Sequence, residues 1–176
     1  KDFIEIEYTA RIKETNALVD TTSEETAKKE NSFNKDYKYG PKGICLGQNH
    51  ILPSLESELI GKELNKTYKI ELTPEKALGK KNPKLIRTES TNFFKQQNIN
   101  PFPGLQIVDA YGRIITVRSV TGGRAIIDYN HPLAGRNLVY EIKVNKIITN
   151  NKEKIICLIS NLGLPNNKYE IKVNGK

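Results

Sequence analysis

The chain has 176 residues, of which 28 are lysine or arginine and 20 are aspartate or glutamate, giving a formal net charge of +8. Hydrophobic residues make up 37% of the chain, which is enough for a packed core and too much for a wholly disordered protein. No apolar run approaches the roughly 18 residues that a membrane span needs, and the first residues lack the apolar centre of a signal peptide. We therefore expect a cytoplasmic protein with no membrane partner.

The basic residues are scattered rather than clustered. Residues 146–176 hold six basic and two acidic side chains, whereas residues 1–84 hold 15 and 14. Nucleic-acid-binding modules normally concentrate basic side chains together with aromatic ones, and no such pattern occurs. We expect no nucleic-acid partner, and we keep a basic nucleic-acid-associated module as a weaker alternative.

Cysteine and histidine are both rare. The chain contains Cys45, Cys157, His50 and His131. Two thiols are too few for a disulfide framework or a four-ligand zinc site, and two histidines are too few for a His-rich metal site. We interpret the cysteines as small buried hydrophobic residues of a reducing compartment, with a single bridge between the two ends of the chain as the alternative. We expect no metal and no cofactor.

The first half of the chain is predicted to be mostly extended. Alternating apolar residues predict strands at residues 3–12, from 18, at 44–46 and at 67–73. A short helix is expected within residues 22–30, capped by Thr22 or Ser23, and another at residues 52–60, where Pro53 occupies the first turn. A long surface loop is expected over residues 31–43, because it is rich in Asn, Asp, Lys, Gly and Pro.

Residues 85–128 are predicted to form a separate unit. A short helix at 91–97 precedes three short strands at 105–109, 113–120 and 124–128, which are joined by glycine-containing turns. A long alternating strand then follows at 138–148, with Leu138, Tyr140, Ile142 and Val144 on one face.

The last residues are predicted to hold one helix at 155–162 and one strand at 169–173. These two elements are too small to bury a core of their own. We interpret residues 150–176 as an appendage that packs on something else or begins a longer domain.

No arrangement of residues is typical of nucleophilic or acid–base catalysis. We interpret His131, which precedes Pro132, as a structural imidazole that ties a loop, and His50 as an exposed residue before a helix. The acidic pair Glu56 and Glu58 is expected on the solvated face of that helix. Asp20 lies at the end of a predicted strand and is the one acid that stands out as a candidate functional residue. The alternative is that Asp20 only forms a turn or caps the following helix.

Three segments resemble the FKBP-type peptidyl-prolyl cis/trans isomerases, in the SlyD-like branch and its long archaeal form. The segments are residues 47–61 (GQNHILPSLESELIG), 73–86 (TPEKALGKKNPKLI) and 128–144 (DYNHPLAGRNLVYEIKV). The run Asn-His-Pro-Leu-Ala-Gly, followed by Leu-Val-Tyr, is especially typical of SlyD-like members.

The resemblance implies an α+β fold that is mostly β. Its centre is an FKBP-type curved antiparallel sheet around a short helix, with an inserted small β-rich insert-in-flap domain and the start of a C-terminal α/β appendage. The implied boundaries are 1–85 with 129–149 for the isomerase domain, 86–128 for the inserted chaperone domain, and 150–176 for the appendage. A homodimer through this appendage is left open.

The resemblance also implies a function, the isomerisation of X-Pro bonds in unfolded or nascent polypeptides. Rotation about a peptide bond costs about 18–20 kcal/mol, and the twisted amide is less polar than the planar one. A dry apolar pocket therefore favours the twisted state without a nucleophile or a metal.

The resemblance assigns roles to three sets of residues. The catalytic candidates are Asp20, Tyr8 and Tyr140. The substrate-binding candidates are Val19, Ile44, Ile51, Leu52, Leu55, Leu78, His131 and Leu133. The client-binding candidates of the insert are Phe93, Phe94, Ile99 and Phe102.

Three positions depart from the family pattern. Leu78 stands where many members have an aromatic residue, often a tyrosine whose hydroxyl bonds the substrate backbone. Lys42 stands where many carry an aromatic residue at the pocket edge, and Leu55 replaces a larger aromatic floor. Leu78 and Lys42 favour the alternative function, a non-catalytic holdase chaperone on the same fold.

Overall fold

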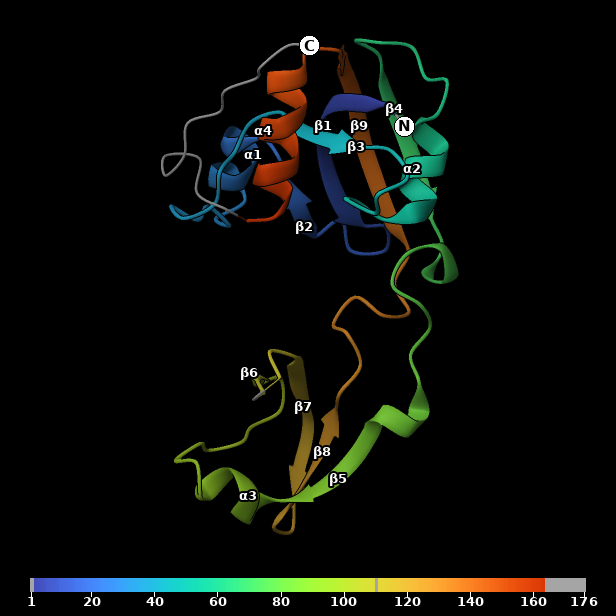
Figure 1. The fold of residues 1–176 in the computed structure, drawn as a ribbon. Coiled ribbons are helices and arrows are strands. Elements are labelled where there is room, and N and C mark those ends of the chain that lie inside the picture. The colour runs from blue at the N-terminus through green and yellow to red at the C-terminus, as the bar shows by residue number, and fades with distance from the viewer. Residues whose placement is uncertain (1, 110, 164–176) are drawn as a thin grey trace. The chain divides into compact units, whose positions relative to one another are not determined.

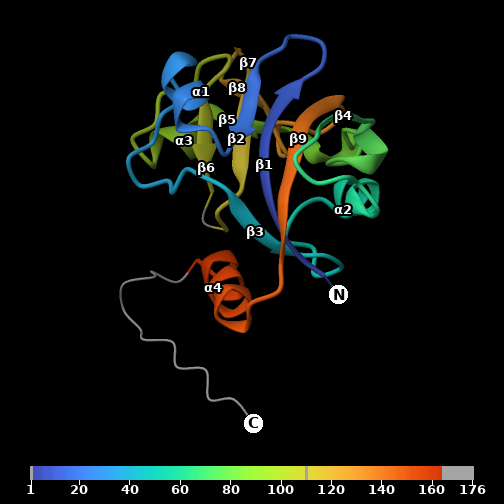
Figure 2. The same ribbon diagram turned by 90° about the horizontal axis from the view of Figure 1, so that it is seen from above.

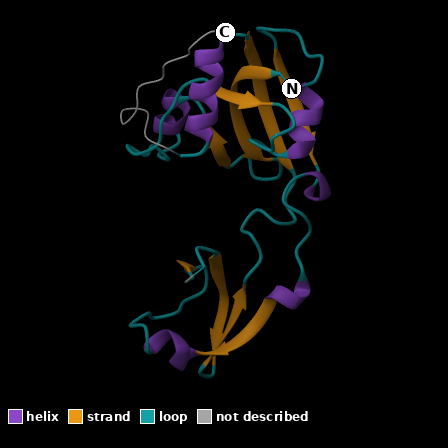
Figure 3. Ribbon diagram, viewed as in Figure 1, coloured by secondary structure: helices purple, strands orange, loops and turns teal. Residues whose placement is uncertain are grey.

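The computed structural model describes residues 2–109 and 111–163, and this part of the chain divides into two compact units (Figure 1). The first unit contains the described residues up to Thr73 and those from Asn137 onward, and the second unit is Pro74–Arg136. Each unit is described by itself. The division lies outside the predicted boundaries of 86 and 128, so the second unit also includes the segments on either side of the predicted insert. Strands dominate both units (Figure 3), which confirms the predicted mixed, mostly β fold.

The first unit is built on an antiparallel sheet with five strands among the described residues. Four strands lie in the order β2-β1-β9-β4 (Figure 2). The strand β3 pairs with the first residues of β1, whereas β2 pairs with its last residues. Their bounds are Phe3–Ile12 for β1, Leu18–Thr21 for β2, Lys42–Cys45 for β3, Thr67–Leu72 for β4 and Leu138–Ile148 for β9. The predicted strands are confirmed, with ends shifted by a residue or two at β3 and β4.

One face of this sheet forms the core. Along β1, Ile4, Ile6, Tyr8 and Ala10 are buried and alternate with half-buried residues, as expected for a strand with one covered face. The predicted face of β9 is confirmed in the same way, because Leu138, Ile142 and Val144 are buried and Tyr140 is half-buried. A bulge opposite Glu5 and Ile6 then shifts the register, so the next buried residue of β9 is Ile148.

The described residues of the first unit form three helices, and local sequence explains where each begins. The helix α1, Glu24–Lys29, is capped by Ser23, whose side chain accepts a 3.2 Å hydrogen bond from the Thr26 N–H. The helix α2, Pro53–Leu59, starts with proline in its first turn and buries Leu55 and Leu59. The helix α4, Asn151–Asn161, is capped by Asn150.

Helix α4 packs against β3, so the helix predicted within the appendage is part of the first unit. A Cβ at Gly43 would lie 3.0 Å from the Cys157 sulfur, so any larger residue at this position would require the Cys157 side chain to shift. The Asn161 side chain donates a 2.8 Å hydrogen bond to the Gly43 carbonyl. Both Cys45 and Cys157 are buried and free. The strand predicted at 169–173 lies outside the described residues.

The second unit has a sheet with four strands among its described residues, in the order β5-β8-β7-β6, all antiparallel. The strands are β5 Ile86–Ser90, β6 Gln106–Val108, β7 Ile114–Thr121 and β8 Arg124–Asp128; the helix α3 is Thr91–Lys95, and the short 3₁₀ turns η1 and η2 are Pro74–Lys76 and Pro83–Leu85. Strand β5 was not predicted, because only its first residue is apolar. Phe94, Ile115, Val117, Ala125 and Ile127 form the core.

A buried carboxylate ties the two chain segments that lead into this sheet. Asp128 Oδ2 accepts hydrogen bonds from Lys81 Nζ at 3.1 Å and Arg118 Nε at 3.0 Å, and Oδ1 accepts two from Asn130 at 2.8 and 2.9 Å. Burial alone would raise the pKa of Asp128. The hydrogen bonds from Asn130 and Lys81 outweigh it and lower the pKa from 3.8 to about 2. The ionised form is therefore the one that the fold stabilises.

Because the folded pKa is depressed, we expect the stability contributed by Asp128 to be complete above pH 4 and to be lost as the pH falls toward 2. Asp128→Asn should lower the free energy of unfolding at pH 7 by about 1–3 kcal/mol, since two cationic partners lose their acceptor. Urea unfolding at pH 7 and pH 3 measures both effects. The exposed Asp2→Asn is the control, and equal losses in the two variants would contradict the role of Asp128.

Candidate active site

One row of paired residues crosses four strands of the first unit. Asp20 of β2 pairs with Ala10 of β1, Ala10 with Tyr140 of β9, and Tyr140 with Ile70 of β4. Directly paired residues project from the same face of a sheet, so Asp20 shares the face that buries Ala10 and Ile70. Ala10, the smallest side chain of the row, is fully buried between Asp20 and Tyr140. The row places one acid at the edge of an apolar surface.

Tyr8 lies two residues before Ala10 and on the same face of β1. Its hydroxyl donates a 2.6 Å hydrogen bond to Asp20 Oδ2, and its ring centroid lies 6.0 Å from that of Tyr140. The other carboxylate oxygen of Asp20 accepts a 2.8 Å hydrogen bond from the Thr21 N–H. Both oxygens are therefore held in place from within the fold.

The two tyrosines remain protonated donors at neutral pH. Burial, the hydrogen bond to Asp20 and the charge of Asp20 hold the pKa of Tyr8 far above its usual range. Burial and the same charge raise the pKa of Tyr140. The site thus combines one carboxylate with two neutral phenols.

The turn after Asp20 is closed by Thr22. Its side-chain oxygen accepts a 2.9 Å hydrogen bond from the Tyr8 N–H, and its own N–H donates to the Tyr8 carbonyl at 2.9 Å. A register shift within the pairing of β2 with β1 leaves Val19 as an extra residue beside Asp20. These contacts fix the end of β2 directly before α1 begins.

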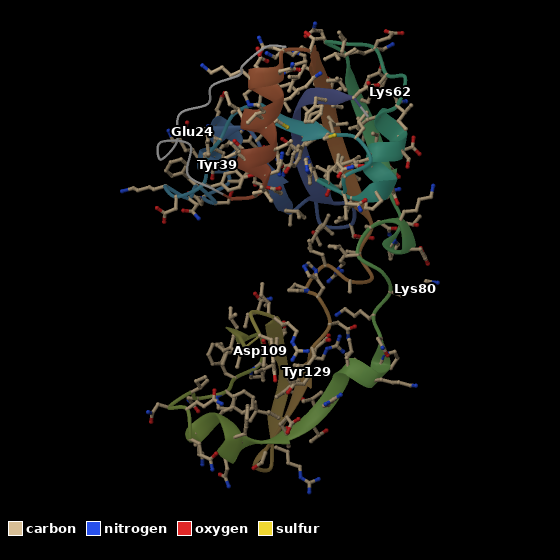
Figure 4. The ribbon with its side chains drawn as sticks, in the orientation of Figure 1. Glu24, Tyr39, Lys62, Lys80, Asp109 and Tyr129 are labelled. Carbon is tan, nitrogen blue, oxygen red and sulfur yellow. The ribbon has the colours of Figure 1, made fainter. Side chains whose placement is uncertain are left out.

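The loop over residues 31–41 brings an aromatic group to Asp20 that the sequence analysis missed. The Tyr37 hydroxyl lies 3.5 Å from Asp20 Oδ1. The Tyr37 ring meets Tyr39 edge-on at 4.9 Å, and Tyr39 stacks on Phe33 at 5.5 Å. Three aromatic residues in one polar loop were the available signal. Tyr39 is labelled in Figure 4 near Glu24 of α1.

Tyr37 and Tyr39 border a cavity of about 150 Å³ beside Asp20. Its lining comes from β2, α1 and the loop, namely Leu18, Val19, Asp20, Thr21, Ala27, Ser32, Asn34, Tyr37 and Tyr39. Val19, a predicted substrate-binding residue, is therefore placed beside the carboxylate.

The other predicted substrate-binding residues of the first unit lie on β3 and around α2. Ile44 and Leu55 are fully buried, and Ile51 and Leu52 are half-buried in the segment that leads into α2. This placement suits Ile51 and Leu52 for contact with a ligand and makes Ile44 and Leu55 part of the underlying core. Their roles in binding stay predictions.

The segment before α2 is held by a buried acid. Glu56 accepts hydrogen bonds from the Gly47 N–H at 2.8 Å and the His50 N–H at 3.1 Å, and His50 Nδ1 accepts one from the Cys45 N–H at 3.1 Å. Two sequence interpretations are therefore wrong: Glu56 is buried rather than solvated, and His50 is a half-buried acceptor rather than an exposed residue. Glu58 is exposed, as expected.

The remaining substrate-binding candidates belong to the second unit. Leu78 and Leu133 are half-buried, and His131 is exposed. His131 Nδ1 accepts a 3.2 Å hydrogen bond from the Leu133 N–H, which confirms the imidazole that ties this loop. A common pocket of these residues with Asp20, which belongs to the first unit, stays a prediction.

The client-binding candidates of the insert differ in exposure. Phe94 is fully buried in the core of the second unit, and Ile99 packs against that core. Phe93 and Phe102 are exposed by 46% and 55%. Val108, Tyr111 and Ile114, which the sequence analysis did not single out, are exposed as well. Asp109, which directly follows Val108, is labelled in Figure 4.

Within residues 2–109 and 111–163, no group of three or more His, Cys, Asp or Glu side chains is arranged to hold a metal ion. No helix in this part of the chain combines the length and apolar character needed to cross a membrane.

Comparisons with known proteins agree with this architecture. The family model described as "FKBP26, IF domain" matches residues 91–133, a segment that contains β6, β7 and β8. The chain is 27% identical over 146 residues to a "Short-type peptidyl-prolyl cis-trans isomerase" of Methanocaldococcus jannaschii, covering 83% of this chain and 91% of the relative. The chain is thus similar to FKBP-type isomerases.

Bacterial relatives show the same similarity. The chain is 29% identical over 116 residues to a SlyD protein of Treponema pallidum, and the match covers 64% of this chain and 65% of the relative. It is 28% identical over 105 residues to an FKBP-type 16 kDa isomerase of Escherichia coli, covering 58% and 70%. The predicted FKBP-type and SlyD-like resemblance is confirmed. The long form stays a prediction, because it depends on residues after 163.

Glu56 and Glu58 form a matched pair for testing the segment before α2. Glu56→Gln should lower the free energy of unfolding by about 1–3 kcal/mol, because a charged acceptor of two backbone N–H groups is lost inside the fold. Glu58→Gln, which changes an exposed side chain, should stay within about 0.5 kcal/mol. Urea unfolding of both variants measures the difference, and a Glu56→Gln variant as stable as Glu58→Gln would contradict it.

Proposed function

We propose that this chain is a peptidyl-prolyl cis/trans isomerase that acts on X-Pro bonds in unfolded or partly folded polypeptides. The observation that carries the proposal is the Asp20 carboxylate, held by Tyr8 at the edge of an apolar face that also holds Tyr140. The names of the archaeal and bacterial relatives support it, since each is called a peptidyl-prolyl cis-trans isomerase.

The reaction needs a site that prefers the twisted amide to the planar one. The planar X-Pro amide is stabilised in water by its charge separation, and the barrier to rotation is about 18–20 kcal/mol. Tyr8, Val19 and Tyr140 supply a surface with little water, on which the planar form loses more stabilisation than the less polar twisted form. No bond is broken, so no nucleophile is required.

The Asp20 carboxylate adds an oriented electrostatic field to this apolar surface. Its carboxylate repels the oxygen of the substrate carbonyl and attracts the positive end of a peptide dipole. Because Tyr8 and the Thr21 N–H hold both oxygens, the field is fixed before the substrate arrives. A fixed field favours one sense of rotation over the other.

The proposal predicts that Asp20→Ala lowers kcat/KM for a short proline-containing peptide by about tenfold, which corresponds to about 1.4 kcal/mol. The exposed Asp2→Ala should have no effect. A protein whose refolding is limited by a prolyl step should also refold faster with catalytic amounts of the native chain. If the native chain accelerates neither reaction but suppresses aggregation, it is a holdase chaperone instead.

A second function, client binding by the second unit, is favoured by its exposed aromatic side chains. Phe93 and Phe102 are 46% and 55% exposed and are not among the buried residues that form the core of this unit. Exposed apolar groups of this size are typical of a surface that binds other chains. We therefore propose that unfolded polypeptides bind here before their X-Pro bonds are isomerised.

The double variant Phe93→Ser and Phe102→Ser should weaken suppression of aggregation and the acceleration of protein refolding by at least about threefold, while turnover of a short peptide stays unchanged. The variant Ile60→Ser removes an apolar side chain of the first unit that is 70% exposed, and it should leave both properties intact. Equal behaviour of the two variants would remove the role of Phe93 and Phe102.

The absence of nucleic-acid and membrane partners, the homodimer through the appendage and the cytoplasmic location stay predictions. The part of the appendage on which a dimer would depend lies beyond Gly163, outside the described residues.

A further inference from the structure

We propose that Tyr37 supplies a second catalytic hydroxyl, which moves from Asp20 to a carbonyl oxygen that flanks the X-Pro bond when the substrate binds. Tyr37 can act in this way only if the isomerase function proposed above holds. Its role is independent of the family motifs, because none of the three segments that carry the resemblance contains it.

The backbone around Tyr37 is anchored to the elements that carry the site. The Tyr37 N–H donates a 3.2 Å hydrogen bond to the Asn34 carbonyl, and the Gly40 N–H donates one of 2.8 Å to the Thr22 carbonyl. Thr22 follows Asp20 closely in the chain and bonds to Tyr8. The loop therefore holds the ring beside the carboxylate although the loop has no regular secondary structure there.

The two hydroxyls that reach Asp20 differ in how firmly they are bound. Tyr8 is 7% exposed and its bond to Asp20 is 2.6 Å long. Tyr37 is 40% exposed and its bond of 3.5 Å is at the outer limit for a hydrogen bond. Asp20 Oδ1 keeps the Thr21 N–H when Tyr37 leaves. The Tyr37 hydroxyl can therefore leave Asp20 and donate to a substrate at a small cost in hydrogen bonding to Asp20.

The Tyr37 hydroxyl can offset the repulsion between the Asp20 carboxylate and the carbonyl oxygens of a bound peptide. A peptide that binds next to a carboxylate brings carbonyl oxygens into a region where acceptors repel one another. A phenol between them donates to the incoming oxygen and relieves the repulsion. Burial and the charge of Asp20 raise the pKa of Tyr37, so the group is protonated and able to donate at neutral pH.

The packing of the ring prepares this position. Tyr37 meets Tyr39 edge-on, and the Tyr39 hydroxyl accepts a 3.0 Å hydrogen bond from the Asn34 N–H. Tyr39 is thereby fixed to the same residue whose carbonyl holds the Tyr37 backbone. Rotation of the Tyr37 hydroxyl toward a ligand needs no rearrangement of this support.

The test compares the native chain with Tyr37→Phe and Tyr68→Phe on a short proline-containing peptide. Each variant removes one phenol hydroxyl and keeps the ring. Tyr68 lies on β4, which β1 and β9 separate from the strand that carries Asp20, and its hydroxyl accepts a 3.1 Å hydrogen bond from the Glu63 N–H. We expect Tyr37→Phe to lower kcat/KM by about three- to tenfold, as for one neutral hydrogen bond, and Tyr68→Phe to change it by less than about twofold.

A substrate change separates a direct contact from a structural effect. Two further peptides each carry one thioamide, a weaker acceptor, in place of the amide on the N-terminal or the C-terminal side of the X-Pro bond. With one of them the difference between the native chain and Tyr37→Phe should disappear. If the difference stays the same with both, Tyr37 does not donate to the substrate.

The outcomes distinguish this inference from the function on which it rests. If the native chain turns the peptide over, Asp20→Ala slows it and Tyr37→Phe equals Tyr68→Phe, the role of Tyr37 is overturned and the isomerase function stands. If the native chain gives no turnover at all, both are overturned.

Discussion

The antiparallel pairing of β1 with β9 is the constraint on which the first unit depends. It runs from Phe3 opposite Ile148 to Ile12 opposite Leu138 and joins two segments that are more than a hundred residues apart in the chain. Each doubling of the length of a closed loop raises the free-energy cost of closing it by only about 0.6 kcal/mol. The fold therefore tolerates a whole second unit inserted in the chain between β4 and β9. A slip of one residue would turn Tyr8, Ala10 and Tyr140 away from the core.

This register also sets the chemistry of the candidate site. Ala10 stands between Asp20 and Tyr140 because β1 has neighbours on both sides at that level. Tyr8 reaches Asp20 because residues two apart on a strand share a face. The site therefore consists of apolar and aromatic groups around one oriented carboxylate, and that is the kind of site in which an amide can twist without covalent chemistry.

The second unit combines a buried core with aromatic rings that are partly exposed. Phe93 and Phe94 are neighbours in α3 whose rings meet edge-on at 5.5 Å. Phe94 fills the core, whereas Phe93 faces solvent. The hydrogen bonds that Asp128 accepts from Lys81, Arg118 and Asn130 tie together the segments that lead into the sheet of the same unit.

The sequence by itself determined the elements whose pattern is local, and it carried the resemblance to FKBP-type isomerases. Strands β1 and β9 follow from alternation and α2 from Pro53 and its spaced leucines; Tyr8, Asp20 and Tyr140 followed from the resemblance. Only the tertiary structure decided β5, the buried state of Glu56, the bonded state of His50 and the place of Tyr37. Each of these depends on a partner distant in the chain or a backbone group, which composition and periodicity do not record. Strand β5 exists because β8 offers it a free edge, and Tyr37 reaches Asp20 because the loop folds back across 17 residues.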